Sequence, residues 1–522
     1  MIMKMLKIQP ARDKAIVIKE PLSYTGNVMR NRIWYRGDPS ELDQFFKKSA
    51  SDDVSKSRFW AAVPSVGNVR KMHSGLPSII VERLSDIVIS DIDSITVNND
   101  NPKTGATKVW EDIAKDNNFI ELLSSAIIET LVTGDGAFKI SVDTNLTPYP
   151  IIEFYSGENV DYNYERGRLK EIWFYDFYTK EQQEYKLKVI YGKGYIDYRL
   201  YDNSDKEVDI NTLDETKGLS RTEFDLDKIM GIPLSFMKSA KFKDRGKSIY
   251  EGKSDSFDAL DETLSQWVDA IRDGRVTKYM PDDLIPRDKD NGELLTPNPF
   301  DNKFIKVKSA GLSESGDADK IDVVQPSINY EAYVATYAND LDKCLQGIIS
   351  PSTLGIDLKK TDNAEAQREK EKTTLYTRGK IIDTLSEETP ELIQIVLQVN
   401  DILYGKKPGE YEAMIEFGEY STPTFDQTIE TVGQAAQNNL MSVETRVESI
   451  WGDRKDETWK EEEVKRLKEL MGIADVDEPR INMDVGGFKT NVEGGLPDEG
   501  AGGEENVQHE PEGVPGVTKN SQ

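Results

Sequence analysis

The chain has 522 residues, of which 66 are basic and 94 acidic, so its formal net charge is −28. This balance argues against a protein that grips nucleic acid along a basic surface, although not against one that lets DNA slide past. The single cysteine, Cys344, and two distant histidines, His73 and His509, give poor support to a disulfide framework, a Cys or multi-His metal site, or Ser-His-Asp chemistry. No apolar run approaches the length of a membrane span, and "MIMKMLKIQP" is too short for a signal peptide.

The N-terminal quarter reads as mainly helical. A short helix, a turn at Gly37-Asp38-Pro39 and a second helix are expected within residues 27–46, and residues 105–133 show helical spacing of apolar residues. Between them, the alternation in "VISDIDSITV" predicts a strand with Asp91 and Asp93 on its solvent face. A pair of metal-binding carboxylates is the alternative interpretation of these two aspartates.

From Gly136 to Val208 the pattern changes to period two. Runs such as "LKEIWFYDFYT" and "EYKLKVIYG" alternate apolar and polar residues, with turn sequences between them. This pattern predicts an antiparallel β region.

Two Gly-Lys-Ser triplets stand at 246–248 and 252–254 and resemble the end of a phosphate-binding P-loop. The spacing is wrong, because five residues separate Gly246 from Gly252 and Lys241 stands where the first triplet needs a glycine. Instead, Ser248 and Glu251 have the spacing of a capping box, which predicts a helix that starts at Ser248. Gly252 would weaken its first turn by about 1 kcal/mol relative to alanine.

The predicted helix has an apolar face and an opposite acidic face, and it ends near Gly274. The apolar face consists of Phe257, Leu260, Leu264, Trp267, Val268 and Ile271, and the polar face carries Asp255, Asp258, Glu262 and Asp269. Residues 275–326 read as short strands with loops. A second helix over 328–348 has an apolar face of Tyr330, Tyr333, Val334, Tyr337, Leu341, Cys344, Leu345 and Ile348. Cys344 is expected to be a small buried hydrophobe.

The C-terminal third is predicted to be helical. After the polar break "SPSTLGIDLKKTDNAE", a long helix runs from 363 to 403 with Pro390 as a bend or restart. Thr458 and Glu461 form another apparent capping box. From Ala474 the composition changes to Gly, Glu, Pro and Asn, which cannot bury enough apolar surface to fold alone.

The ordered set of stretches resembles the portal proteins of tailed double-stranded-DNA bacteriophages. "GIPLSFMKSAKFKDRGKSIYEGKSDSFDALDETLSQWVDAIRDGR" is similar to the passage from the family's wing into its first stem helix, and "ISPSTLGIDLKKTDNAEAQ" to the loop after the second. "AAQNNLMSVETRVESI" with the acidic helix after it is similar to the C-terminal crown. The resemblance covers roughly residues 20–470, and no single motif is diagnostic.

The resemblance implies an α+β, multi-domain subunit. Its parts would be a wing (1–245), stem helix 1 (246–274), a β-rich clip (275–326), stem helix 2 (327–349), a channel loop (350–362), the long helix and return strand of the wing (363–426), an α-helical crown (427–473) and an acidic tail (474–522), expected to be disordered.

The family's role implies a homo-oligomeric ring, twelve-fold in the virion, at one capsid vertex, through which DNA is packaged and ejected. Expected partners are the terminase large subunit, the major capsid protein and scaffold, a head–tail adaptor, and weakly bound double-stranded DNA, with no membrane. The location would be the virion, and the host cytoplasm during assembly. The chain would be no enzyme, and no cofactor or metal is expected.

Candidate site residues also follow from the resemblance. Lys359, Lys360, Asp357 and Asn363 would lie at the DNA channel, although an ordinary solvated lysine pair remains open. Stem packing would involve Phe257, Leu260, Leu264, Trp267, Tyr333, Tyr337 and Leu341, and clip docking Arg287, Lys289, Lys303 and Lys306. The aromatic helix 328–348 could face a neighbouring subunit, its partner helix, or both.

Two rival classes stay open. One is another ring or collar component of a phage tail, a structural protein without DNA passage. The other is a nuclease that uses clustered carboxylates with a divalent metal.

Overall fold

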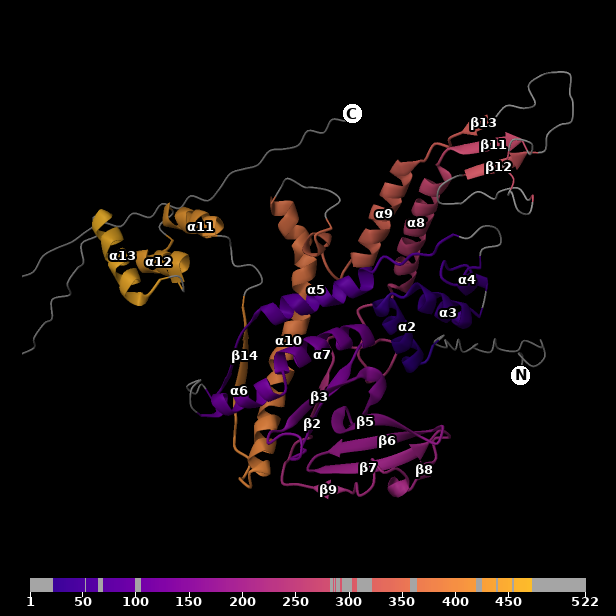
Figure 1. Cartoon of the computed structure of the whole chain (residues 1–522). Coiled ribbons are helices and arrows are strands. Elements are labelled where there is room, and N and C mark those ends of the chain that lie inside the picture. Colours follow the sequence, from indigo (N-terminus) through magenta and orange to yellow (C-terminus); the bar gives the residue numbers. More distant parts are fainter. Residues whose placement is uncertain are drawn as a thin grey trace, which may run out of the picture. The chain divides into compact units, whose positions relative to one another are not determined.

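The computed structural model shows a mixed fold of helices and strands in two compact units, residues Met1–Thr422 and Pro423–Gln522. It describes residues 22–51, 53–63, 69–98, 105–281, 285, 287, 292, 303–307, 322–356, 364–418, 425–437, 440–452 and 455–471. Each unit is described by itself (Figure 1).

From residue 22, where the described part of the first unit begins, the chain forms the helices α2 (Tyr24–Arg36) and α3 (Pro39–Ser49) and the short α4 (Asp53–Lys56). The expected helix–turn–helix is confirmed. Gly37 ends α2 with a left-handed φ of 68°, and the Asp38 carboxylate accepts from Ser40 N at 2.7 Å to cap α3. Trp34 and Phe46 meet edge to face in the core beneath this turn.

The stretch expected to be one strand is divided between a helix and a strand. Helix α5 (Leu76–Ser90) continues into it, and strand β1 is limited to Ile92–Val97. Ile80, Leu84 and Val88 explain the difference, because they recur at helical spacing and are all fully buried. Asp91 therefore caps α5 rather than lying on a strand's solvent face, and its carboxylate pairs with Arg378 at 2.6 Å.

Two further helices and a small sheet follow. Helices α6 (Ala106–Asp116) and α7 (Phe119–Thr133) confirm the helical prediction for 105–133. Strand β2 (Gly136–Ser141) then pairs antiparallel with β3 (Ile151–Ser156) on one side and β10 (Gly231–Leu234) on the other.

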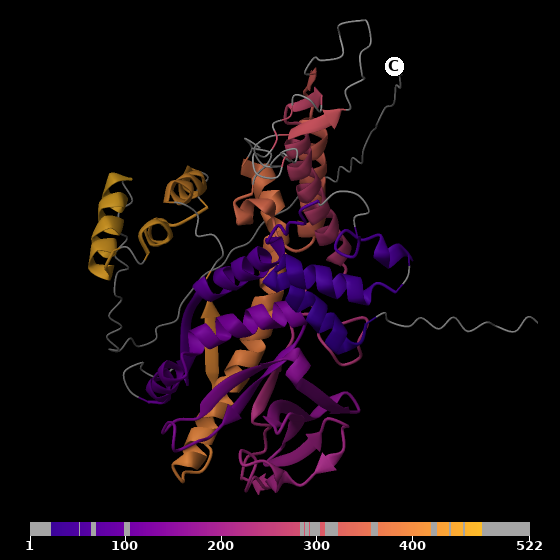
Figure 2. The same cartoon turned by 45° about the vertical axis from the view of Figure 1, so that its right-hand side comes forward.

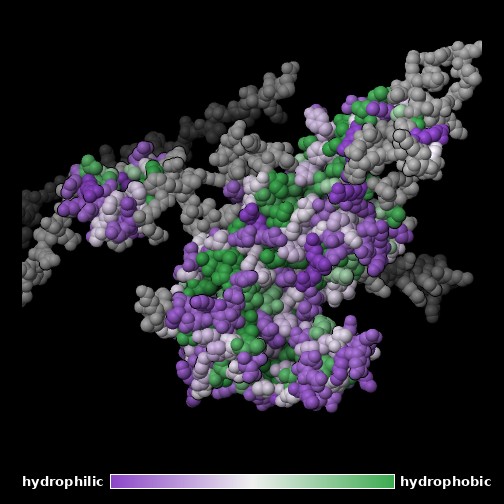
Figure 3. Space-filling model, viewed as in Figure 1, coloured by the Kyte–Doolittle hydropathy of each residue, from purple (hydrophilic) through white to green (hydrophobic). Residues whose placement is uncertain are grey.

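A larger antiparallel sheet, together with β2 and β3, confirms the β prediction for 136–208. It is a meander of β4 (Val160–Glu165), β5 (Arg168–Lys180), β6 (Gln183–Gly192), β7 (Tyr195–Asp202) and β8 (Glu207–Val208), with β9 (Thr222–Glu223) also on β7. Short 3-10 turns lie at Gly157–Asn159 and Ile210–Thr212. One face of this sheet carries Ile172, Phe174 and Leu200, which are buried. The part of the same sheet that is visible in Figure 3 is mostly polar.

Helices α8 (Ser254–Asp273) and α9 (Tyr330–Leu345) lie side by side and run antiparallel. The chain between them forms a three-stranded sheet of β11 (Thr277–Pro281), β12 (Lys303–Val307) and β13 (Asp322–Val324), as Figure 2 shows. Strand β11 pairs in parallel with β12 and antiparallel with β13.

The longest helix, α10 (Ala364–Leu403), continues through Pro390 without a restart. It follows the 3-10 turn η4 (Pro351–Leu354) and packs against α5, β10 and the strand β14 (Ala413–Phe417), which pairs with β1. Its buried residues Leu385, Ile393 and Val396 join the main core of the first unit.

The described residues of the second unit form the helices α11 (Phe425–Gln437), α12 (Val443–Trp451) and α13 (Glu457–Leu470). The expected capping box at Thr458 is wrong. The cap is Asp456, which accepts from Trp459 N at 3.1 Å, so Thr458 lies inside the helix. The predicted acidic tail lies outside the described residues.

Candidate functional site

The outer half of the α8–α9 pair exposes apolar side chains. The inner residues Phe257, Leu260 and Leu341 are at most 2 % exposed. Farther along the pair, Ile271 is 49 % and Tyr330 62 % exposed. Val334 is also exposed, and apolar residues reach the surface along α9 in Figure 3. Burial thus falls steadily from the root of the pair toward its inserted sheet.

Aromatic rings join the two helices in this outer half. Trp267 lies parallel to Tyr333 within 6°, with ring centroids 6.3 Å apart, and lies at 6.2 Å from Tyr337. Near the far end, a side chain on Gly274 would collide with Ile328 at 2.4 Å. The two segments therefore stay close along the whole pair.

The root of α8 is anchored by two buried aspartates. Asp258 accepts hydrogen bonds from Phe59 N at 2.9 Å and Trp60 N at 3.1 Å. Asp261 accepts from Trp60 Nε1 at 3.1 Å and lies 2.7 Å from His73 Nδ1. The sequence placed Asp258 on the polar face of the helix, but the side chain is buried, and these donors compensate its burial. Burial still raises the pKa of Asp258 above its usual range.

The first Gly-Lys-Ser triplet packs against the end of α7 instead of forming a phosphate loop. A phosphate cradle needs free backbone N–H groups. The N–H groups of this stretch are already donated: Gly246 N to the Asp135 carboxylate, Lys247 N to Met237 O, Ile249 N to Leu131 O, Tyr250 N to Ser248 Oγ and Lys253 N to Tyr250 O.

The predicted start of stem helix 1 at Ser248 is also wrong. The Ser248 hydroxyl is buried, donates to Val132 O at 2.6 Å and accepts from Tyr250 N at 3.1 Å within a turn, so it does not cap α8. Gly252 has a left-handed φ of 82°, which a turn before the helix favours. The helix therefore begins six residues later, at Ser254.

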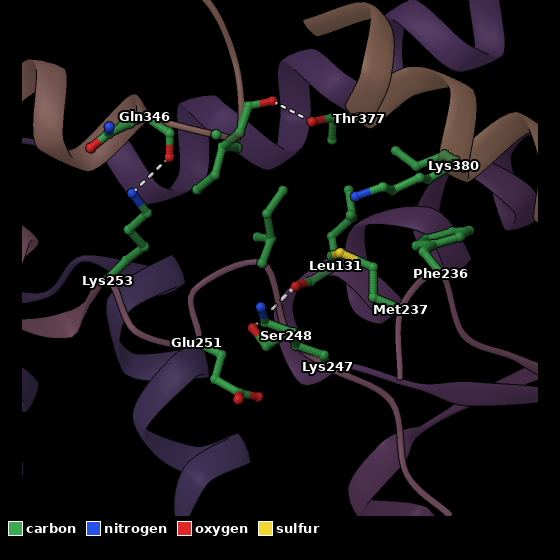
Figure 4. Close-up of a pocket in the computed structure, with 14 residues that line it drawn as sticks. Leu131, Phe236, Met237, Lys247, Ser248, Glu251, Lys253, Gln346, Thr377 and Lys380 are labelled. Carbon is green, nitrogen blue, oxygen red and sulfur yellow. Dashed lines mark hydrogen bonds between the residues drawn. The ribbon is translucent and has the colours of Figure 1, made fainter. Parts of the chain in front are cut away.

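Lys253 of the second triplet connects the two helices at their root. Its Nζ donates to Gln346 O at 2.8 Å (Figure 4) and to Lys343 O at 2.7 Å, which satisfies carbonyls at the end of α9. Burial lowers the pKa of Lys253. A pocket of about 200 Å³ lies beside it, with Lys247, Glu251 and Lys380 among its polar lining residues.

An ion pair between Arg245 and Asp135 joins the segment that leads into α8 to the end of α7. Asp135 Oδ1 accepts from Arg245 at 2.9 Å and from the Tyr24 hydroxyl at 2.8 Å. Burial alone would lower the pKa of Arg245, but Asp135 and Tyr24 reverse this effect and raise it. A side chain on Gly246 would meet the Gly134 carbonyl, so only glycine fits this contact. Arg245 and Asp135 are far apart in the sequence, so no local sequence pattern predicts their contact.

The other predicted site residues are only partly placed. Asp357, Lys359, Lys360 and Asn363 lie outside the described residues, as does Lys289. Before them, Ser350 N donates to Thr374 Oγ1 of α10 at 2.9 Å. Arg287 is exposed and donates to Gly292 O at 3.3 Å, and Lys303 and Lys306 lie on β12.

Burial of Cys344 agrees with its prediction. It is fully buried on α9, and burial raises the pKa of its thiol to about 12. Within the described residues, no cluster of three or more His, Cys, Asp or Glu side chains could hold a metal ion. None of the helices in the same ranges is long and apolar enough to cross a membrane.

Comparison with known proteins gives only distant similarities. No protein-family model and no curated protein sequence matches the chain. A chain from the virion of a native gene transfer agent particle is similar with a TM-score of 0.34 and 13 % identity, covering 86 % of this chain and 97 % of that one.

Two neck structures give similar values. A chain from the neck of the native particle, computed with C12 symmetry, has a TM-score of 0.33 and 14 % identity, and the match covers 72 % of this chain and 89 % of that one. A chain from the neck of the empty particle, computed with C6 symmetry, has a TM-score of 0.32 and 13 % identity, and the match covers 73 % of this chain and 95 % of that one. TM-scores and identities of this size do not establish a shared fold or family.

Proposed function

We propose that the chain is the portal protein of a phage-like particle, a ring subunit at one capsid vertex through which double-stranded DNA enters and leaves. The observation that carries this proposal is the antiparallel α8–α9 pair, which holds a small sheet between its helices and exposes apolar residues along its outer half. The sequence resemblance assigns these elements to the stem and the clip.

The exposed apolar residues support assembly. Ile271, Val276, Tyr330 and Val334 are each more than 40 % exposed, and they lie on or next to two adjoining helices. Contiguous exposed apolar surface on a water-soluble domain favours contact with another chain. In a ring, the same pair of each neighbouring copy would cover these residues.

The charge suits a channel through which DNA moves. A chain with a net charge of −28 repels phosphates, so tight binding that would stop transport is disfavoured. On this proposal the chain is not an enzyme, and the energy for packaging comes from a terminase that docks on the clip. The head–tail adaptor would dock on the clip after the terminase, and the capsid protein and scaffold would contact other parts of the ring.

Light scattering of the purified full-length chain tests the proposal. We expect a large closed assembly, close to twelve times the 59.0 kDa of one chain. The same sample should leave double-stranded DNA intact in the presence of Mg²⁺ or Mn²⁺. A monomer at micromolar concentration that cleaves DNA with metal would instead support the nuclease alternative.

A further inference from the structure

The two ends of the six-stranded sheet carry opposite charge. Because β4 to β8 form a meander, the turns at 166–167 and 193–194 lie at one end, and those at 181–182 and 203–206 lie at the other. In Figure 1, β9 marks the first end and β8 the second. Side chains at each end are mostly exposed.

The first end is basic. Its hairpin turns carry Arg166, Arg168, Lys170 and Lys193 against Glu165, and these residues line an open pocket of about 760 Å³ together with Leu169 and Tyr195. At the same end, β9 adds Glu223, which pairs with Arg221 at 3.1 Å, and Glu171 accepts from the Tyr195 hydroxyl at 2.7 Å. Glu165 pairs with Lys170 at 3.2 Å. Arg166, Arg168 and Lys193 have no acidic partner within the described ranges. In a chain of strongly negative net charge, this end is a local exception.

The second end is acidic. Its turns and the adjoining residues carry Glu181, Glu184, Asp202, Asp205, Glu207 and Asp209 against Lys180 and Lys206. The nearby Lys186 pairs with Asp205 at 2.5 Å, and Lys180 donates to Thr212 O at 2.7 Å. Several carboxylates, including Glu181 and Glu184, therefore face solvent without a basic partner in the part of the chain that the structure describes.

Both hairpin turns hold charged residues where the backbone disfavours them. Arg166 has a φ of 52° and Glu181 one of 51°, and each is followed by a second residue of positive φ. Such two-residue turns favour Asn-Gly, because only glycine and asparagine adopt this conformation readily. Charge of opposite sign is thus present at the two tips despite local strain.

The two ends cannot neutralise each other within one subunit. The ten residues of β6 span about 33 Å at roughly 3.3 Å per residue. Screening in physiological salt acts over about 8 Å. Each end therefore presents its own sign of charge to whatever approaches it.

We propose that the basic end of this sheet in one subunit docks against the acidic end of the sheet in the next copy of the chain. This inference rests on the proposed ring. A head-to-tail contact between two different surfaces of one protein is the kind that closes into a ring. Repulsion between like ends would also disfavour contacts in the wrong direction.

Two charge reversals test the contact. One variant combines Arg166→Glu with Arg168→Glu, and the other combines Glu181→Lys with Glu184→Lys. In 50 mM salt, each alone should need at least tenfold more protein than wild type for half-assembly, measured by light scattering. A 1:1 mixture of the two should assemble better than either variant alone, because contacts between oppositely charged ends become available again. High salt should reduce all of these differences.

The controls separate this contact from other effects. Lys406→Glu with Lys407→Glu makes the same change in net charge as the basic-end variant, but at an exposed loop, and should assemble normally. Unchanged thermal unfolding of the reversed monomers would show that the hairpins still fold.

Several outcomes would overturn the inference. If wild type forms rings and each reversed variant does so equally well, the sheet ends are not an interface, and the proposed ring stands without them. The inference also fails if the basic-end variant loses only binding to double-stranded DNA, or if wild type forms two-fold dimers through these ends. If wild type forms no ring in any salt, the proposed function itself fails.

Discussion

The indole of Trp267 on α8 lies parallel to the ring of Tyr333 on α9 within 6°, with centroids 6.3 Å apart. Trp267→Ala should remove this contact and that with Tyr337, at a cost of about 2 kcal/mol in the free energy of unfolding. Urea unfolding at matched protein concentration measures the change, and Trp267→Phe should retain most of the stability. An unchanged urea midpoint for Trp267→Ala would show that the rings do not join the helices.

Lys253 should stabilise the root of the helix pair and take no part in nucleotide chemistry. Lys253→Met keeps the alkyl chain but removes the donor to two carbonyls at the end of α9. We therefore expect the free energy of unfolding to fall by about 1–2 kcal/mol. The wild-type chain should show no ATP turnover in a phosphate-release assay. Turnover that disappears in Lys253→Met would contradict the interpretation of the Gly-Lys-Ser stretches.

Glu388 on α10 should make stability depend on pH. Burial, with Glu391 and Glu387 nearby, raises its pKa to about 7. A carboxyl whose pKa is raised by folding contributes stability below the pKa of the unfolded chain, near 4.5, and loses it as pH rises through about 7. At pH 8, the free energy of unfolding of Glu388→Gln should therefore exceed that of wild type by about 1–3 kcal/mol. At pH 4.5 the two should differ little.

Glu387→Gln is the matched control for this pH effect, since Glu387 is the exposed neighbour of Glu388. Thermal unfolding of both variants from pH 4.5 to 8 decides the question. Equal pH profiles for Glu388→Gln and wild type would exclude a buried, protonated carboxyl at this position.

The clip assignment predicts where a terminase docks. Replacement of residues 275–326 by a short Gly/Ser linker should leave the rest of the first unit folded but abolish terminase binding in a pull-down. Circular dichroism is the control for folding. Undiminished binding would place the docking surface elsewhere.

The channel-loop assignment predicts a weak contact with DNA. Each solvated lysine–phosphate contact at Lys359 or Lys360 should be worth about 1 kcal/mol or less. Lys359→Ala with Lys360→Ala should thus leave the ring intact and alter packaging or DNA retention. Packaging and retention equal to wild type would make this an ordinary solvated pair.

Local periodicity predicted the elements whose packing agrees with their sequence pattern. The alternation of Ile172, Phe174 and their neighbours indicated the meander, because one face of that sheet is buried. Phe119, Leu123 and Ile127 likewise marked α7 by their helical spacing, and all three are buried.

Long-range contacts account for the errors. Ser248 had the spacing of a helix cap, yet its hydroxyl bonds to a carbonyl 116 residues away. Asp258 was predicted on the polar face of its helix, but it is buried and its donor Phe59 N lies 199 residues away. Asp91 pairs with Arg378, which is 287 residues distant. No local pattern contains these partners, so the start of α8 and its buried carboxylates could not be predicted.

Electron microscopy of the purified full-length chain tests the central claim most directly. The portal proposal predicts closed rings around a central hole wide enough for double-stranded DNA, with the α8–α9 pair of each subunit facing its neighbours. Compact particles without a hole, or monomers at micromolar concentration in buffers that support capsid assembly, would contradict it.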